Sequence, residues 1–146
     1  MDSPSSAAQT LAERVRDSMF RTDAAAQALG LQVTAISAGH ATVTMAVRAD
    51  MLNGFGICHG GLISTLADTA FAYACNSYND LTVASGFDVD LLAAGREGDL
   101  LTAQAAVVSQ AARMGVYDVE VRNQAGERVA VFRGRSYRIK GKTVVA

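Results

Sequence analysis

The chain has 146 residues and a mass of 15.2 kDa, enough for one domain with a sizeable core but not for two. Half of the residues are hydrophobic and 18% are charged, a composition that excludes a disordered chain. The net charge of −1 gives no electrostatic basis for binding nucleic acid or an acidic membrane surface, so we expect a small-molecule partner or a second copy of the chain.

The N-terminus and the cysteines bear on the compartment. The first nine residues contain neither the basic nor the apolar segment of an export signal, and no apolar run reaches the roughly 20 residues of a membrane span. Cys58 and Cys75 are too few for a disulfide scaffold and lack the spacing of metal ligands. We therefore expect a cytoplasmic protein with no membrane partner, no metal and no cofactor.

A tail and two short helices are predicted to precede the first strand. Residues 1–6 are expected to be a flexible tail, followed by a single domain over residues 7–146. From Ala7 to Phe20, apolar residues recur at helical spacing among charged ones, which predicts an amphipathic helix. A second short helix is expected to be capped by Thr22 or Asp23.

Beyond Leu31 the apolar period changes from about 3.6 to 2, the spacing of β-strands. The predicted strands, in chain order, cover residues 31–37, 40–48, 83–92, 100–110, 113–123 and 127–140. Polar residues alternate with apolar ones along these strands, so each has one wet face and the sheet is expected to be mostly antiparallel. Gly134 is expected to mark a bulge or bend in the last strand.

One long helix is predicted between the second and third strands. After Gly61, apolar residues come in pairs every four positions, from Leu62 onward to Cys75, which marks one buried helix face. Ser64 and Asp68 lie on the flank of this face, so the carboxylate is expected at the border of the buried stripe. A single dominant helix with a mostly antiparallel sheet predicts an α+β fold in which the helix packs across a curved sheet.

A glycine-rich loop leads into this helix, with the sequence Asn53-Gly-Phe-Gly-Ile-Cys-His-Gly-Gly61. Gly60 and Gly61 open the helix, so their N–H groups lack intrahelical partners and lie at the positive end of the helix dipole. Because Gly60 has no side chain, a ligand carbonyl oxygen can approach these N–H groups, as an oxyanion hole requires. We predict that this loop and helix form the active-site element.

The order of elements and the motif Asn53-x5-His59-Gly60-Gly61-x6-Asp68 resemble the hotdog-fold acyl-CoA thioesterases, specifically the phenylacetic-acid-degradation (PaaI-type) family. The likeness continues in Leu66-Ala-Asp-Thr-Ala-Phe-Ala72, Ala84-Ser-Gly86, Gly115-Val-Tyr-Asp-Val-Glu120 and Arg133-Gly-Arg-Ser-Tyr137. It implies a hotdog fold, a dimer of dimers and hydrolysis of aryl- or medium-chain acyl-CoA thioesters. The chain departs from the family at Leu92-Ala93-Ala94, where many relatives have Arg-Pro-Ala, so no role is assigned there.

Gly60 and Asp68 cannot act together within one chain, because eight residues of α-helix span about 12 Å. They meet on one carbonyl group only if two copies supply them, which predicts a homodimer with two composite sites. The resemblance implies a homotetramer. In this site the Gly60 N–H polarises the thioester carbonyl, and Asp68 of the other subunit acts either as a general base on water or as a nucleophile.

His59 and Asn53 are the remaining candidates for the catalytic group, as residues that orient water, the thioester or the loop. Each also has a structural interpretation, because His59 stands at a loop–helix junction and Asn53 precedes a glycine in a turn. Cys58 is expected to be a buried thiol rather than a nucleophile. The candidates for substrate binding are Gly61, Ser85 and Phe55.

Two other functions fit the same residues. A hotdog hydroxyacyl-thioester dehydratase needs a histidine and an acid placed to abstract a proton from carbon, and a non-catalytic acyl-CoA-binding module would use Asp68 only as a hydrogen-bond partner. The position of Asp68 on the helix favours hydrolysis over dehydration. By composition alone, the basic residues available to CoA phosphates are Arg113, Arg133, Arg135, Lys140 and Lys142.

Overall fold

The computed structural model describes residues 5–146. Its helices are α1 (Ser6–Thr22), α2 (Ala24–Ala28) and α3 (Gly60–Asn76), with one 3₁₀ turn, η1 (Ala49–Met51). Its strands are β1 (Gln32–Ser37), β2 (His40–Ala46), β3 (Asp80–Leu91), β4 (Leu100–Ala111), β5 (Met114–Arg122) and β6 (Arg128–Thr143). All the predicted helices and strands are present, but β3 begins at Asp80 rather than Val83, β6 continues to Thr143 rather than Lys140, and η1 was not predicted. None of the described helices is long and apolar enough to span a membrane.

The N-terminal helices are fixed by two side-chain caps. Ser5 accepts the Ala8 N–H on its Oγ (3.2 Å), so α1 already begins within the expected tail; residues 1–4 lie outside the described part of the chain. Asp23, one of the two predicted caps, accepts the Ala26 N–H at the start of α2 (3.1 Å). Its other carboxylate oxygen accepts the Tyr73 hydroxyl of α3 (3.1 Å), which ties the N-terminal helices to the central one.

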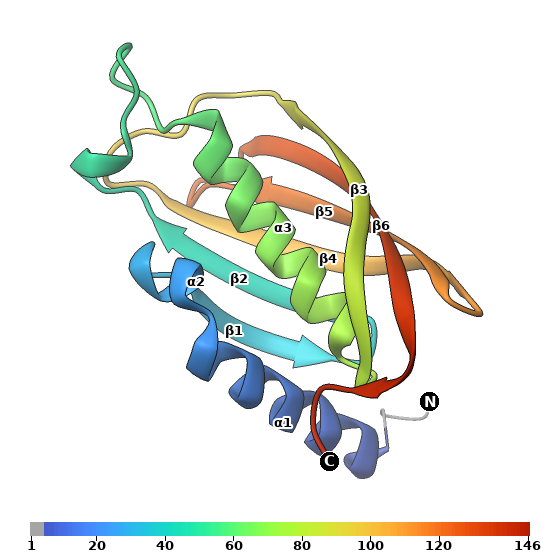
Figure 1. The fold of residues 1–146 in the computed structure, drawn as a ribbon. Helices are drawn as coiled ribbons and strands as arrows, with labels where there is room; N and C mark the ends of the chain where they lie inside the picture. The colour runs from blue at the N-terminus through green and yellow to red at the C-terminus, as the bar shows by residue number, and fades with distance from the viewer. Residues whose placement is uncertain (1–4) are drawn as a thin grey trace.

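The six strands form one antiparallel sheet in the order β1-β2-β4-β5-β6-β3. Helix α3 lies across one face of this sheet and contacts all six strands, while α1 and α2 lie beside β1 (Figure 1). The core fills the space between α3 and the sheet, where the buried face of the helix meets the inward side chains of the strands. The predicted α+β architecture, with a long helix packed on an antiparallel sheet, is confirmed.

The buried face of α3 is closed by aromatic contacts near its middle. The Phe71 ring lies 5.7 Å from that of Tyr117 and 5.8 Å from that of Phe132, measured between centroids, in tilted arrangements. Gly134 provides the space for this ring, because a Cβ atom there would come within 2.7 Å of Phe71. The glycine is therefore required by the close approach of the helix to the sheet.

Gly134 was predicted to mark a bulge or a bend, and the bulge is wrong. Gly134 pairs in register with Phe87 on β3 and with Tyr117 on β5, without a shift on either side. The register of β3 and β6 shifts instead between Asp80 and Thr82 and between Ala84 and Gly86, and at the second shift Ser85 is the extra residue of β3. Sequence alone could not separate a bulge glycine from one that accommodates a neighbouring ring.

Strand β3 is an edge strand, and several apolar side chains along it are exposed. These are Leu81, Val83, Phe87 and Leu91, followed directly by Leu92. A long apolar edge with unpaired backbone groups is a template for pairing with another strand. In Figure 1, β3 runs alongside α3, so a strand added at this edge would bring its own helix close to α3.

Candidate active site

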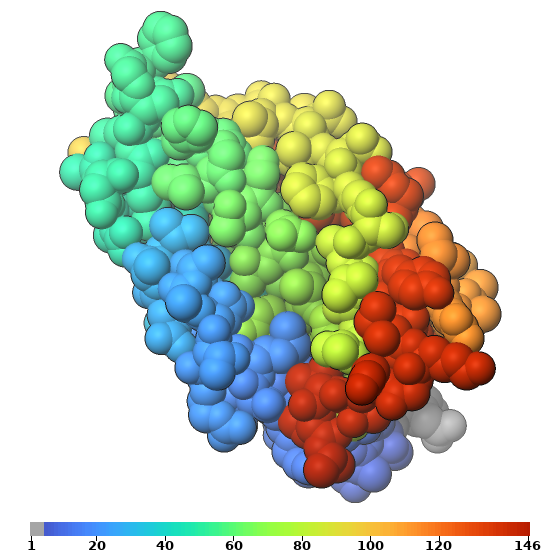
Figure 2. All heavy atoms as spheres, in the orientation of Figure 1, coloured from blue at the N-terminus to red at the C-terminus, as the bar shows by residue number. Residues whose placement is uncertain are grey.

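Asn53 builds the loop that leads to α3. Its Oδ1 accepts the N–H groups of Phe55 (2.9 Å) and Ile57 (3.3 Å), and its own N–H donates to the Ile57 carbonyl (2.8 Å). Gly56 completes the turn with a φ of 76°. The loop protrudes from the body of the protein in Figures 1 and 2. Phe55 is 91% exposed, so its ring contacts little of its own protomer.

The β5–β6 hairpin contains a second loop of the same construction. Asn123 Oδ1 accepts the N–H groups of Ala125 and Glu127 (both 3.0 Å), and its N–H donates to the Glu127 carbonyl (3.0 Å). Gly126 has a φ of 79°. The bonds of Asn53 Oδ1 are therefore those of an ordinary loop, as its structural interpretation predicted. What Asn53 retains for chemistry is its Nδ2 amide, which has no acceptor among the described residues.

His59 caps α3 and selects which amide remains open. Its Nδ1 accepts the Gly61 N–H (3.0 Å), so in the neutral ring the proton lies on Nε2 of an exposed side chain. The Gly61 N–H is thus already bonded, whereas the Gly60 N–H has no acceptor within residues 5–146. The open donor at the start of α3 is Gly60 alone, not the pair of glycine amides that the sequence suggested.

Asp68 lies half-buried at the border of the buried stripe, as predicted. Burial raises the pKa of its carboxyl, and no partner for it is found among the described residues. The nearby hydroxyls are bonded to the helix itself, because Ser64 donates to the Gly60 carbonyl (2.9 Å) and Thr65 to the Gly61 carbonyl (2.9 Å). Thr69 likewise donates to the Thr65 carbonyl (2.7 Å). The Asp68 carboxylate is left for a group from outside the protomer.

The single protomer does not bring Gly60 and Asp68 together. Both belong to the continuous helix α3, which begins at Gly60. Eight residues correspond to about 12 Å along the axis, roughly two turns. The donor and the acid are therefore two separate half-sites on one helix.

A pocket of about 350 Å³ opens beside the start of α3. Besides Gly60, its lining residues are Asn53, Ile57, Cys58, Ile63, Leu91, Leu92, Ala93, Ala94 and Gly95. Apart from Asn53, the side chains that line the pocket are apolar. Residues 91–95 form one side of the pocket, and the sequence assigned them no role. No periodicity or charge marks this segment. Only its position at the end of β3, beside the N-terminus of α3, makes it part of the site.

Ser85 and Cys58 are the two other residues that the sequence analysis considered for the site. Ser85 is exposed in the β3 bulge, where its Oγ donates to the Arg135 carbonyl (3.1 Å) and keeps acceptor capacity. Cys58 is free and buried, as expected, and burial raises the pKa of its thiol, which disfavours the thiolate that a nucleophile needs.

Two of the basic residues suggested for CoA phosphates are engaged elsewhere. Arg133 makes a two-point ion pair with Asp118 (2.7 and 2.8 Å), and Arg135 pairs with Asp88 (2.9 Å). Asp118 alternates along β5 with the buried Tyr117, so these pairs lie on the face of the sheet opposite α3. They are poorly placed for a ligand at the start of that helix.

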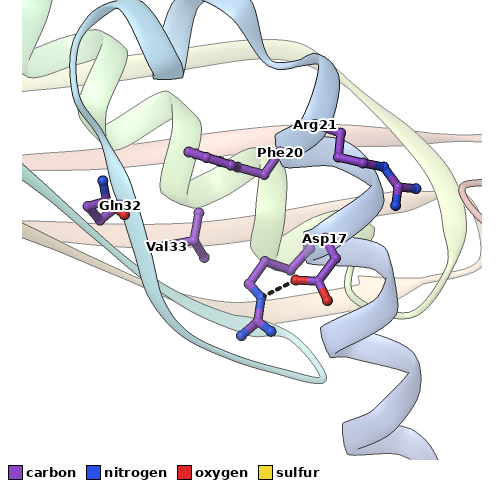
Figure 3. Close-up of a pocket in the computed structure, with 6 residues that line it drawn as sticks. Asp17, Phe20, Arg21, Gln32 and Val33 are labelled. Carbon is purple, nitrogen blue, oxygen red and sulfur yellow. Dashed lines mark hydrogen bonds and ion pairs between the residues drawn. The ribbon is translucent and has the colours of Figure 1, made fainter.

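A second pocket of about 350 Å³ lies between α1 and β1 and contains none of the candidate residues (Figure 3). Phe20 and Val33 form its apolar part, Arg16 is paired with Asp17 (3.0 Å), and Arg21 points away from the apolar part. Within residues 5–146, no group of three or more His, Cys, Asp or Glu side chains is arranged to hold a metal ion.

Comparison with known proteins places the chain among thioesterases. The profile of the thioesterase superfamily matches residues 55–130. The acyl-coenzyme A thioesterase PaaI of Escherichia coli is 52% identical over 123 residues, which cover 84% of this chain and 88% of that protein. A protein of Streptococcus mutans, solved bound to acetyl-CoA, is 29% identical with a TM-score of 0.74, over 77% of this chain and 90% of that one.

The fold is shared with the solved structure of E. coli PaaI, a protein of the phenylacetic acid degradation operon. The TM-score is 0.90 at 49% identity, and the match covers 92% of this chain and 97% of that one. The hotdog fold that the sequence motif implied is thereby confirmed. The chain belongs to the thioesterase superfamily, in its PaaI-type hotdog family.

Proposed function

We propose that this protein hydrolyses acyl-CoA thioesters, with an aryl or medium-chain acyl group such as phenylacetyl, to the free acid and CoA. The observation that carries the proposal lies on α3, where neither the Gly60 N–H nor the Asp68 carboxylate, eight residues later, has a hydrogen-bond partner in the described part of the chain. The identity to a named acyl-CoA thioesterase and the acetyl-CoA bound by a relative support this substrate class.

The catalytic unit in this proposal is a homodimer formed by pairing two β3 edge strands around a two-fold axis. Such pairing covers the exposed apolar side chains of β3 and places the two α3 helices side by side. Helices related in this way run antiparallel. With the two-fold axis close to Ser64, halfway between Gly60 and Asp68, the Gly60 end of one helix faces Asp68 of the other. A homotetramer then consists of two such dimers.

In each composite site the Gly60 N–H donates to the thioester carbonyl oxygen, and Asp68 of the other subunit takes a proton from water. The resulting hydroxide attacks the carbonyl carbon, and the negative charge that develops on the oxygen is stabilised by the amide at the positive end of α3. The tetrahedral intermediate then expels the CoA sulfur, which receives the proton from Asp68 and leaves as the thiol.

Three further groups complete the site. The Nε2–H of His59 and the Nδ2–H of Asn53 are side-chain donors at the loop–helix junction without an acceptor among residues 5–146, and we assign them to orienting the thioester. Ser85 Oγ serves as an acceptor for water. Phe55, exposed on the protruding loop, gains its contacts only when substrate or a second subunit is present.

A nucleophilic route is the alternative for Asp68, with attack on the thioester to form an anhydride that water then hydrolyses. The two routes differ in the fate of the water oxygen when water attacks the Asp68 carbonyl of the anhydride, because that attack leaves the water oxygen on Asp68. A single turnover in ¹⁸O-labelled water, followed by mass spectrometry of the Asp68 peptide, tests the general-base route. Label in the Asp68 carboxylate would contradict it.

Release of free thiol from a panel of acyl-CoA substrates, followed with a thiol reagent, tests the proposed function. Turnover is expected with phenylacetyl-CoA and medium-chain substrates, and Asp68→Asn is expected to remove it. An enoyl product without free thiol would instead indicate a dehydratase. Tight binding without any turnover would indicate a non-catalytic binding module.

A further inference from the structure

We infer that the pocket beside Gly60 receives the acyl group of the substrate and that Leu91, at the end of β3, sets the size of acyl group that fits. This inference rests on the proposed thioesterase function. It concerns the pocket lined by Ile57, Cys58, Ile63 and residues 91–95 beside Asn53 and Gly60. Of these residues, the motif assigns a role only to Asn53 and Gly60.

Leu91 lies directly against Gly60. A Cβ atom on Gly60 would come within 2.5 Å of Leu91 Cδ1, so the leucine side chain occupies the space above the glycine. Leu91 is also 51% exposed in the single protomer, so it forms the rim of the pocket rather than part of the core, at the end of the strand that the proposed dimer pairs. A carbonyl group bonded to the Gly60 N–H therefore lies close to Leu91, and we place the acyl chain attached to that carbonyl along the leucine side chain.

The polar groups around the pocket indicate which part of an acyl-CoA it holds. Three backbone N–H groups of its lining are bonded, with Cys58 donating to Gly95 (2.7 Å) and Leu92 and Ala93 donating to Val129 (2.8 and 3.2 Å), whereas the N–H of Gly60 is open and, in the proposed function, bonds the thioester carbonyl. The pantetheine arm of CoA carries two amides, which lose hydrogen bonds to water if they are buried without partners. An apolar acyl group has no such requirement, so it is the better occupant.

The volume is consistent with a ring-sized acyl group. The pocket measures about 350 Å³. An apolar cavity of roughly 150 Å³ holds one benzene molecule. The small side chains of Ala93 and Ala94 leave this space open, whereas Leu91 narrows the entrance beside Gly60. Truncating Leu91 and enlarging Ala93 should therefore change substrate preference in opposite directions.

The test compares kcat/KM for acetyl-CoA, phenylacetyl-CoA and naphthylacetyl-CoA in the full-length protein and its variants. Leu91→Ala is expected to raise the ratio of kcat/KM for naphthylacetyl-CoA to that for phenylacetyl-CoA about tenfold. Ala93→Leu is expected to lower the ratio for phenylacetyl-CoA to acetyl-CoA by about the same factor. A change of about tenfold is the lower end of what one methylene group in a hydrophobic pocket contributes to specificity. Leu100→Ala, which truncates an exposed leucine on β4 outside the pocket, is the matched control and should leave both ratios unchanged.

A binding measurement separates this inference from the proposed function. Thioether analogues of the same CoA derivatives cannot be hydrolysed, so their dissociation constants report on the pocket whether or not the protein turns over substrate. The ratios of affinity, taken as the reciprocals of these dissociation constants, are expected to shift in the same directions as the ratios of kcat/KM. If both ratios in both variants match those of Leu100→Ala, in kinetics and in binding, the assignment of the pocket is overturned. Leu91→Val, expected to shift the ratios less in the same direction, replaces Leu91→Ala if circular dichroism shows that the alanine variant is unfolded.

Discussion

At the scale of single residues, Asp68 on α3 differs from Asp118, an acid on the opposite face of the sheet. Asp118 is paired with Arg133, which holds the pKa of its carboxyl below the ordinary range. Asp68 has no cation beside it, and burial raises its pKa. A carboxylate with a raised pKa is a stronger base than an ordinary one, which suits the proton transfer proposed for it.

The raised pKa of Asp68 predicts the acidic limb of the pH–rate profile. A general base must be deprotonated, so kcat/KM should fall as pH decreases through the pKa of Asp68, at a pH above the ordinary value of 3.8. The measurement is kcat/KM for phenylacetyl-CoA between pH 4 and 8. A profile that stays flat down to the ordinary aspartate range would contradict the role of Asp68 as the base.

Asn53 and Asn123 offer a matched pair for separating loop structure from chemistry. An aspartate at either position keeps an oxygen in place of Oδ1 and can accept the same two N–H groups, but it lacks the Nδ2 donor. If Asn53 donates to the thioester, Asn53→Asp should lower kcat/KM by about tenfold or more, as expected for the loss of one hydrogen bond of roughly 1.5 kcal/mol.

Asn123→Asp should leave kcat/KM unchanged, because the β5–β6 loop has no substrate to orient. Circular dichroism and thermal unfolding of both variants would show whether the loops persist. Equal activities for Asn53→Asp and Asn123→Asp would assign Asn53 to loop structure alone.

At the scale of elements, the start of α3 allows a backbone donor to be removed by substitution. Gly60 is the first residue of the helix, a position that accepts proline, and His59 has the extended conformation that a following proline requires, with φ −59° and ψ 129°. Gly60→Pro removes the N–H, whereas Gly60→Ala keeps it and adds a comparable Cβ next to Leu91.

Gly60→Pro is expected to turn over substrate about 100- to 1000-fold more slowly than Gly60→Ala, the usual effect of losing one oxyanion donor. The measurement is kcat for phenylacetyl-CoA in both variants. Similar values in the two would mean that the steric effect of the new side chain, and not the amide, accounts for any loss.

Helix α3 also shows how far sequence predicts this molecule. Its limits, its buried face and the border position of Asp68 followed from a strong 3.6-residue period, because burial on one side of a helix must repeat with its turns. The cap formed by His59 could not be predicted in the same way, since it depends on the backbone angles at one residue. Gly134 and residues 91–95 depend on contacts between segments distant in sequence, which no local pattern records.

At the scale of the whole molecule, the composite site can be tested by mixing two inactive proteins. In a mixed dimer of Asp68→Asn and Gly60→Pro subunits, one site has an intact Gly60 from the first subunit and an intact Asp68 from the second. Random exchange of equal amounts makes half of the dimers mixed, each with one working site of two, so about one quarter of wild-type activity should return.

The control for this mixture is each variant exchanged with itself, which should remain inactive. Exchange is verified by mass spectrometry of differently labelled subunits. If mixed dimers form and no activity returns, Gly60 and Asp68 act from the same subunit, and the two half-sites proposed on α3 are wrong.

The hydroxyls beside Asp68 have a consequence for the stability of the fold. Because Ser64, Thr65 and Thr69 donate to helix carbonyls, the ionised carboxylate loses hydration on folding without gaining a local hydrogen bond. With a folded-state pKa above the unfolded one, Asp68 stabilises the fold below its unfolded pKa, and this contribution is lost as pH rises through its folded pKa.

Asp68→Asn is therefore expected to raise the midpoint of thermal unfolding at neutral pH, while Asp118→Asn, which breaks the pair with Arg133, should lower it. A lower midpoint for Asp68→Asn would show that the carboxylate has a stabilising partner in the assembled protein. If the midpoint rises as expected, the residue proposed for catalysis is one that weakens the native state. Selection for heat resistance without selection for turnover would be expected to replace Asp68 early.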